Sequence, residues 1–180
     1  MRAVAAPRLV LEPQTAAHAA EMYALLADPA LYRHENEPPP SVDWLRERFV
    51  RLESRRSSDG REEWLNWVIR LRAEGDLAGY VQATVRVDGS AAIAYVLGSA
   101  HWGRGLATEA VRAMIDELAA HHGVRTLRTV LKHSNGPSLR LLQRLGFAPA
   151  TPEEDRRRAV EPDERLLWRD VAEGAADDRR

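Results

Sequence analysis

The chain has 180 residues, with 26 Lys and Arg against 27 Asp and Glu, so its formal net charge is −1. This length favours a single domain with a sizeable core. The balanced charge excludes a global field that would recruit nucleic acid or an anionic membrane surface. The absence of cysteine excludes disulfides, thiol nucleophiles and cysteine metal ligands, and it suits a cytoplasmic location. No apolar run approaches the length of a membrane span, and the N-terminus has no signal-peptide core, so we expect no membrane partner.

The first half of the chain is predicted to form a strand, two helices and two further strands. Apolar spacing and helix-capping residues place them at 8–11, after Thr15, after Ser41, and at 64–72 and 79–87. Alternation in the last of these strands puts four residues on one face, namely Val81, Ala83, Val85 and Val87. The Asp-Gly pair that follows predicts a hairpin turn.

The second half alternates strands and helices. It predicts strands at 92–97 and 127–131, a strand beginning at Phe147 and a strand at 164–171, with helices at 107–121 and after Asn135 or Gly136. This order favours one α/β domain over 1–171, built on a mixed sheet with helices on both faces. Residues 172–180 are expected to form a disordered tail.

A glycine-rich turn joins a strand to a helix within residues 95–108. Gly103 and Gly105 let backbone N–H groups approach a ligand closely, and the helix that follows directs its positive dipole end to the same place. The stretch therefore predicts a pyrophosphate site, with a plain turn as the alternative. A nucleoside-triphosphate loop fits less well, because Arg104 and Gly105 replace its lysine and hydroxyl residue. A dinucleotide loop fits less well because Thr108 stands where its third glycine belongs.

Two motifs together resemble the GNAT N-acetyltransferase superfamily over about residues 8–170. The first is Trp-Gly-Arg-Gly-Leu-Ala-Thr-Glu-Ala at 102–110, and the second is Asn-Gly-Pro-Ser-Leu-Arg at 135–140, followed by Leu-Gly-Phe at 145–147. Trp102 departs from the Gln or Arg usual in the superfamily. It agrees with the branch that acetylates the N-termini of ribosomal proteins, which the sequence resembles most.

The resemblance implies a mostly antiparallel sheet of about seven strands, in which two strands splay apart to admit acetyl-coenzyme A as cosubstrate. The sequence itself shows no cluster of metal ligands, because the adjacent His121 and His122 would point about 100° apart on a helix, so we expect no metal. The resemblance assigns pantetheine to the backbone of Val96 and Leu97 and to Asn135, and the cofactor sulfur to Ser138. It assigns the pyrophosphate to a loop made of Trp102, Gly103, Arg104, Gly105, Leu106, Ala107 and Thr108.

The catalytic residues are less clearly marked. The Ser138 hydroxyl is a candidate to protonate the departing thiolate, although a serine at a helix start also caps backbone N–H groups. Glu109 and His101 are candidate bases, and Tyr95 and His133 lie at strand ends. Glu35 and Glu37 lie in a segment that lines the acceptor cleft in relatives, where carboxylates orient a cationic amine.

The expected acceptor is a primary amine, on a small molecule or at a protein N-terminus. An α-amino group has a pKa of about 7.7–8.0 against about 10.4 for lysine, so a weak base suits the α-amine better. A non-catalytic acyl-coenzyme A-binding or sensor protein on the same fold is the alternative function. The sequence is compatible with a monomer or a homodimer.

Overall fold

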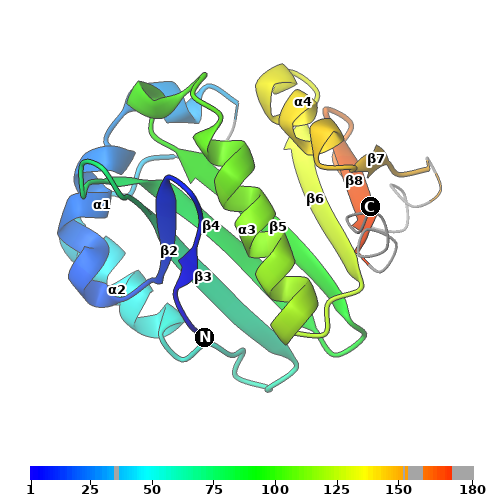
Figure 1. The fold of residues 1–180 in the computed structure, drawn as a ribbon, viewed down its shortest axis with the longest axis horizontal. Helices are drawn as coiled ribbons and strands as arrows, with labels where there is room; N and C mark the ends of the chain where they lie inside the picture. Colours follow the sequence, from blue (N-terminus) through cyan, green and yellow to red (C-terminus); the bar gives the residue numbers. More distant parts are fainter. Residues whose placement is uncertain (35–36, 152, 154–159, 172–180) are drawn as a thin grey trace.

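The structure is a computed structural model that describes residues 1–34, 37–151, 153 and 160–171. Its strands form one eight-stranded sheet in the order β1-β2-β3-β4-β5-β6-β8-β7 (Figure 1). The strands are β1 (Val4–Ala5), β2 (Leu9–Pro13), β3 (Glu62–Leu71), β4 (Leu77–Arg86), β5 (Ser90–Leu97), β6 (Thr126–Lys132), β7 (Ala148–Pro149) and β8 (Glu164–Asp170). The helices are α1 (Ala19–Leu26), α2 (Val42–Leu52), α3 (Leu106–His121) and α4 (Gly136–Arg144), with short 3-10 turns η1 (Ala16–His18), η2 (Pro29–Tyr32) and η3 (Ser99–His101).

The sheet is antiparallel except where β5 meets β6. These two strands run parallel and pair over only three residues each, from Ser90 to Ala92 on β5 and from Thr126 to Arg128 on β6. Beyond that point they diverge, and α3 and α4 begin beside the open end (Figure 1). The splayed strand pair implied by the family resemblance is therefore present in the fold.

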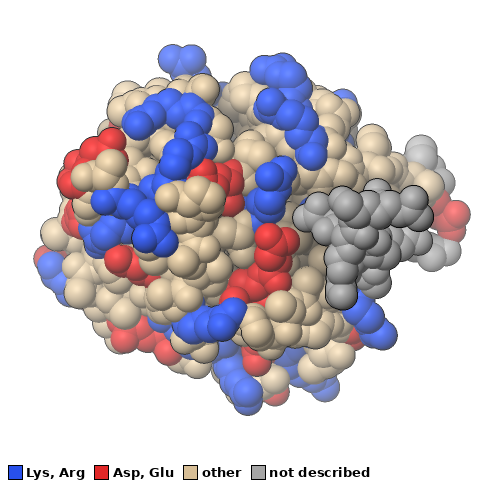
Figure 2. Space-filling model, in the orientation of Figure 1, with Lys and Arg blue, Asp and Glu red and all other residues tan. Residues whose placement is uncertain are grey.

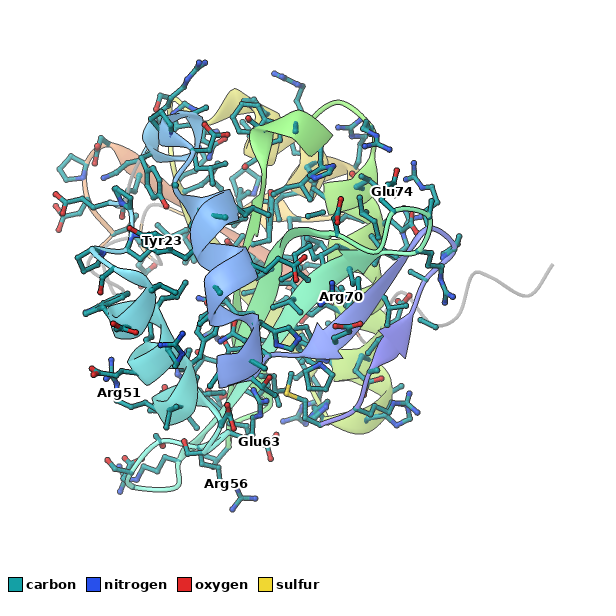
Figure 3. The ribbon with its side chains drawn as sticks, turned by 90° about the vertical axis from the view of Figure 1, so that its left-hand side faces the viewer. Tyr23, Arg51, Arg56, Glu63, Arg70 and Glu74 are labelled. Carbon is teal, nitrogen blue, oxygen red and sulfur yellow. The ribbon has the colours of Figure 1, made fainter. Side chains whose placement is uncertain are left out.

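Helices cover both faces of the sheet, so the core has two parts. On one face, α3 and α4 contribute to a hydrophobic core that also includes Trp67 and Ile69 of β3. On the other face, α1 and α2 form a core with Val68, the β3 residue between Trp67 and Ile69. Figure 3 looks onto the side of α1 and α2 and shows these helices lying over the strands. Successive side chains of β3 enter the two cores in turn, because neighbouring residues of a β-strand point to opposite faces of the sheet.

Local signals place most helix starts where the sequence predicts them. The hydroxyl of Ser41 accepts a 3.1 Å hydrogen bond from the backbone N–H of Trp44 at the start of α2. The residues after Thr15 first form η1, so α1 begins only at Ala19. Because a 3-10 turn commonly opens an α-helix, the boundary differs while the element is the same.

Two features of the strands differ from the sequence prediction. Val87 does not continue the buried face of β4, because the strand ends at Arg86 and Val87 lies in the hairpin turn, 87% exposed. The sheet has eight strands and not about seven, and two of them, β1 and β7, have two residues each. Strands this short leave almost no periodic pattern in a sequence. Among the described residues, no helix is long and apolar enough to cross a membrane.

Candidate active site

The glycine loop lies at the open end of the sheet, between the end of β5 and the start of α3. Gly103 and Gly105 have φ angles of 74° and 75°, in the left-handed region that favours glycine. Gly105 is the N-cap of α3 and has no side chain to cap the first turn, so the first N–H groups of the helix remain available to an anion. The indole N–H of Trp102 donates a 2.7 Å hydrogen bond to the carbonyl oxygen of Leu97, which ties the loop to β5.

Beyond Ala92, the edge of β5 that faces β6 has no strand paired to it. The space that this leaves between β5 and β6 is called the cofactor gap below. The other edge of β5 pairs with β4, so that Val96 lies opposite Tyr80 and Leu97 lies opposite Gly79. Gly79 allows this pairing, because a Cβ there would lie only 2.0 Å from the carbonyl oxygen of Val96. An unpaired strand edge offers N–H and C=O groups to an extended ligand, and pantetheine contains two amide groups that suit it.

Two hydroxyl side chains approach this gap from opposite sides. Tyr95 of β5 packs against the core on the α3–α4 face, and Ser138 is half-buried in the first turn of α4. Burial raises the pKa of Tyr95, and the neighbouring Ser138 opposes that rise. The Tyr95 hydroxyl is buried beside Ser138, and within the described part of the chain no hydrogen bond of standard geometry reaches it. An unpaired buried hydroxyl usually marks a position that a water or ligand fills.

Of the candidate bases, Glu109 forms an ion pair with Arg8. Its two carboxylate oxygens each accept a 2.7 Å hydrogen bond, one from the Arg8 backbone N–H and one from the Arg8 guanidinium. Arg8 also donates a 2.8 Å hydrogen bond to the carbonyl oxygen of Arg104. Glu109 therefore lies on the side of α3 that faces β1 and β2, where it holds the glycine loop in place.

The candidate histidines also have partners. His101 lies in η3, with Nδ1 at 3.3 Å from a guanidinium nitrogen of Arg104. Nε2 of His133 lies 2.7 Å from the carbonyl oxygen of Glu164, and its Nδ1 lies 3.0 Å from the guanidinium of Arg165. Both ring nitrogens of His133 are thus engaged within the protein.

His34 is a residue that sequence reasoning missed. It follows η2, and its Nδ1 lies 3.0 Å from the hydroxyl of Ser134, just before α4. This contact spans 100 positions of the chain and joins the segment between α1 and α2 to the turn beside the cofactor gap. No local pattern marks such a residue, because its neighbour is set by the tertiary fold. Glu35, the other candidate in this segment besides Glu37, lies outside the described residues.

A pocket of about 360 Å³ opens on the face of the sheet covered by α1 and α2. Side chains of three neighbouring strands, Asn66, Tyr80, Gln82 and Val96, contribute to its lining. Asn66 lies opposite Gln82, and Tyr80 lies opposite Val96, so these residues share one face. The pocket therefore reaches β5 at Val96, in the part of the strand beyond Ala92 that borders the cofactor gap.

Basic side chains gather near the cofactor gap. Figure 2 shows Lys and Arg over the start of α3 and over α4, the two helices that flank the splayed strands. Arg104 of the loop and Arg140 of α4 are both exposed. Positive charge here complements the helix dipole toward a phosphorylated ligand. No group of three or more His, Cys, Asp or Glu side chains in the described part of the chain is arranged to hold a metal ion.

The chain belongs to the acetyltransferase (GNAT) domain family, whose sequence pattern matches residues 8–148. A curated relative, the uncharacterized N-acetyltransferase p20 of Bacillus licheniformis, is 38% identical over 60 residues. That match covers 33% of this chain and 34% of the relative, so it spans about a third of the relative's length.

Two solved structures share the fold over nearly the whole chain. RimL, the ribosomal L7/L12 alpha-N-protein acetyltransferase in complex with coenzyme A, superposes with a TM-score of 0.78 at 15% identity, covering 94% of this chain and 98% of that chain. The aminoglycoside acetyltransferase AAC(6')-Ib in complex with coenzyme A gives a TM-score of 0.71 at 18% identity, covering 91% and 95%. At these identities the likeness shows the fold alone.

Proposed function

We propose that this protein is an acetyl-coenzyme A-dependent N-acetyltransferase that transfers the acetyl group directly to a primary amine. The observation that carries the proposal is that two separate sites meet at Val96. The splayed edge of β5 borders one site, and the pocket beneath α1 and α2 reaches the same residue from the other face of the sheet. A protein that only binds an acyl-coenzyme A has no need of the second site.

The cofactor gap fits coenzyme A in three respects. The loop from Trp102 to Thr108 presents left-handed glycines and the open N-terminus of α3 to the pyrophosphate. Beyond Ala92 the edge of β5 that faces the gap has no strand partner, so its free backbone groups suit the two pantetheine amides, although the carbonyl oxygen of Leu97 already accepts from Trp102. The buried Tyr95 hydroxyl, which no hydrogen bond of standard geometry reaches within the described part of the chain, lies beside Ser138, where the thioester end would lie. Acetyl-coenzyme A, when bound, supplies an acyl group activated as a thioester.

The chain's own residues then position and protonate the reactants. The neutral amine nitrogen forms a bond to the carbonyl carbon, the carbon–sulfur bond breaks, and the sulfur takes up a proton. The Ser138 hydroxyl, supported by Tyr95, donates a proton to the sulfur and regains one from solvent. The proton lost by the amine leaves through water at the pocket, which Glu37 of the segment between α1 and α2 helps to line.

The acceptor class also takes support from the relatives' described activities. RimL is described as acting on a protein α-amine and AAC(6')-Ib as an aminoglycoside acetyltransferase, so the fold serves both protein N-termini and small molecules. We propose that this chain acts on an α-amine or another amine of low pKa. Such amines are partly neutral near pH 7 and need only a weak base.

A ligand screen followed by a turnover assay tests the function. Acetyl-coenzyme A at 100 times its dissociation constant stabilises the fold by about 2.7 kcal/mol, which is visible as a rise in melting temperature. ATP and NAD are expected to give much smaller shifts, because the loop lacks the residues that bind them. Thiol release with a panel of amines then separates an enzyme from a sensor. Equal shifts with ATP and acetyl-coenzyme A would contradict the proposed cosubstrate.

A further inference from the structure

The acceptor pocket beneath α1 and α2 is walled mainly by apolar and aromatic side chains. Its walls include Leu31, Tyr32, Trp44, Leu45, Phe49 and the three prolines of 38–40. A volume of about 360 Å³ lies in the range of sites for small organic ligands, about 300–1000 Å³. Walls of this kind stabilise an aromatic or branched apolar group by removing it from water.

The charges on the described residues that line the pocket nearly cancel. Among the described residues that line it, Glu37 is the only acid and Arg48 the only base. Arg48 lies over the ring of Trp44, with its guanidinium carbon 5.8 Å from the ring centre. A ligand with several ammonium groups would bring more positive charge than one carboxylate neutralises, and it would meet the guanidinium as well. A single ammonium group matches the single carboxylate.

Besides the hydroxyls of Tyr32 and Tyr80, the uncharged polar lining of the pocket includes three amides, from Gln14, Asn66 and Gln82. Gln14 is 4% exposed, and its side-chain nitrogen is buried without a hydrogen-bond partner among the described residues. Its backbone N–H donates a 2.9 Å hydrogen bond to the carbonyl oxygen of Asn66, which fixes Gln14 beside β3. A buried amide donor without a partner favours a ligand that brings an oxygen acceptor.

From these three observations we infer the acceptor class, on the basis of the acetyltransferase function proposed above. The acceptor is a primary amine with one positive charge, an aromatic or branched apolar body, and a carbonyl or hydroxyl oxygen near the amine. The oxygen accepts a hydrogen bond from Gln14, the body packs against Trp44 and Phe49, and the amine points along the floor toward Val96. An amide of an apolar amino acid and the first residue of an apolar peptide share this chemistry.

Steady-state assays at saturating acetyl-coenzyme A test the inference with matched amines. Phenylalaninamide and 2-phenylethylamine differ by the carboxamide, and a short peptide with N-terminal Phe distinguishes a peptide source from a free small molecule. Spermidine and kanamycin are the polycations. The value of kcat/KM is expressed per concentration of neutral amine, so that differences in amine pKa do not enter. We expect phenylalaninamide or the peptide to exceed both polycations by about tenfold or more, which corresponds to about 1.4 kcal/mol.

Substitution of Gln14 tests the hydrogen bond itself. Gln14→Met keeps the length of the side chain and removes the donor, with Gln14→Leu as a second variant. Either change should lower kcat/KM for phenylalaninamide about 5- to 100-fold and leave 2-phenylethylamine within about twofold. Arg51→Gln is the matched control, because Arg51 points away from the sheet on the outer side of α2 and does not line the pocket (Figure 3). Gln82→Glu adds a carboxylate to the floor and should raise kcat/KM for spermidine.

The outcomes separate this inference from the proposed function. Preference for a polycation, or an equal loss on both phenyl amines in Gln14→Met, would overturn the acceptor class while acetyltransfer stands. Binding of acetyl-coenzyme A without turnover of any amine in the panel would also overturn it. If acetyl-coenzyme A neither shifts the melting temperature nor is consumed, the proposed function itself fails. The melting temperature and the acetyl-coenzyme A shift of each variant establish that it is folded.

Discussion

The side-chain oxygen of Asn135 accepts a 3.2 Å hydrogen bond from the backbone N–H of Ser138, three residues further along α4. Asn135 is therefore the N-cap of this helix, with Pro137 in its first turn. The sequence leaves open whether Ser138 serves only as a helix-capping residue. In the structure, the side chain that caps this helix is that of Asn135. The Ser138 hydroxyl is not needed for the cap and is available to the cofactor gap.

Ser138→Ala should lower turnover without lowering stability. General acid assistance contributes about 10²–10⁴-fold in rate, so kcat should fall by that order while the melting temperature stays unchanged. Asn135→Ala is the matched variant, and loss of its cap should lower the free energy of unfolding by about 0.5–2 kcal/mol. Turnover is measured at saturating acetyl-coenzyme A with a confirmed amine. Wild-type kcat in Ser138→Ala would transfer the proton donor role to Tyr95 or to water.

Tyr95→Phe should make the ligand-free protein slightly more stable. The Tyr95 hydroxyl is buried without a hydrogen bond of standard geometry among the described residues, and leaving such a group unsatisfied costs about 1–3 kcal/mol. Removal of the hydroxyl relieves this cost, while the ring keeps its packing against the core. The free energy of unfolding should therefore rise, and kcat should fall if the hydroxyl supports Ser138. Denaturant unfolding without ligand measures the first effect, and a clear loss of stability would show that the hydroxyl has a partner in solution.

Gly105→Asp should abolish acetyl-coenzyme A binding in a folded protein. The substitution places bulk and negative charge at the N-terminus of α3, where the pyrophosphate is expected. Gly60→Asp is a close control, because Gly60 has a φ of 70°, no atoms near its Cβ position, and a place in an exposed loop. Both variants carry the same strain from a left-handed backbone. Unchanged acetyl-coenzyme A affinity in Gly105→Asp, measured by calorimetry, would mean that the loop is only a turn.

Gly79→Ala should weaken both the sheet and the cofactor site. The new Cβ would lie 2.0 Å from the carbonyl oxygen of Val96, so β4 and β5 must separate at that point. Overpacking of this kind costs typically about 1–3 kcal/mol of unfolding free energy. Gly75→Ala serves as the comparison, because no atom lies within 4 Å of its Cβ position and its φ is 80°. In Gly79→Ala, the free energy of unfolding measured in urea and the affinity for acetyl-coenzyme A should both fall. In Gly75→Ala, the affinity should be unchanged, and the free energy of unfolding should fall only by the cost of backbone strain.

Glu117 should stabilise the folded protein at pH values above its ordinary pKa, and this stabilisation should be lost in acid. It is 3% exposed on α3, and Arg2 donates hydrogen bonds of 2.8–3.0 Å to its carboxylate. Burial acts to raise the pKa of Glu117, but Arg2, His121 and His122 together lower it below its ordinary value of 4.5. Because the unfolded chain takes up this proton more readily, stability falls as the pH drops below about 5 toward the folded-state pKa.

The measurement compares the melting temperature of Glu117→Gln with that of the wild type across acidic pH. The difference between the two should be largest near neutral pH and shrink as the pH falls. Glu47→Gln, on the exposed side of α2, controls for the loss of one carboxylate. A difference that is independent of pH would show that Glu117 acts through packing alone.

Short-range patterns in the sequence marked the two motifs that we propose to form the cofactor site. The turn at Gly103 and Gly105, the helix that follows it, and the start of α4 after Asn135 all depend on residues within a few positions of one another. Backbone conformation and helix capping are local effects, so a single sequence shows them directly. The alternation of β4 likewise marks its buried face, and it failed only at Val87, where a turn replaces the strand.

The tertiary structure alone decided which side chains meet. Arg8 reaches Glu109, His34 reaches Ser134, and Gln14 comes to line the pocket near Gln82. These neighbours lie tens of residues apart, and their contact depends on strand order, register and the angle at which helices cross the sheet. Such relationships arise from packing of the whole chain, in which no local preference specifies the partner. For this reason the sequence predicts the proposed cofactor loop, whereas the proposed acceptor pocket and the ion pair between Arg8 and Glu109 became visible only in the fold.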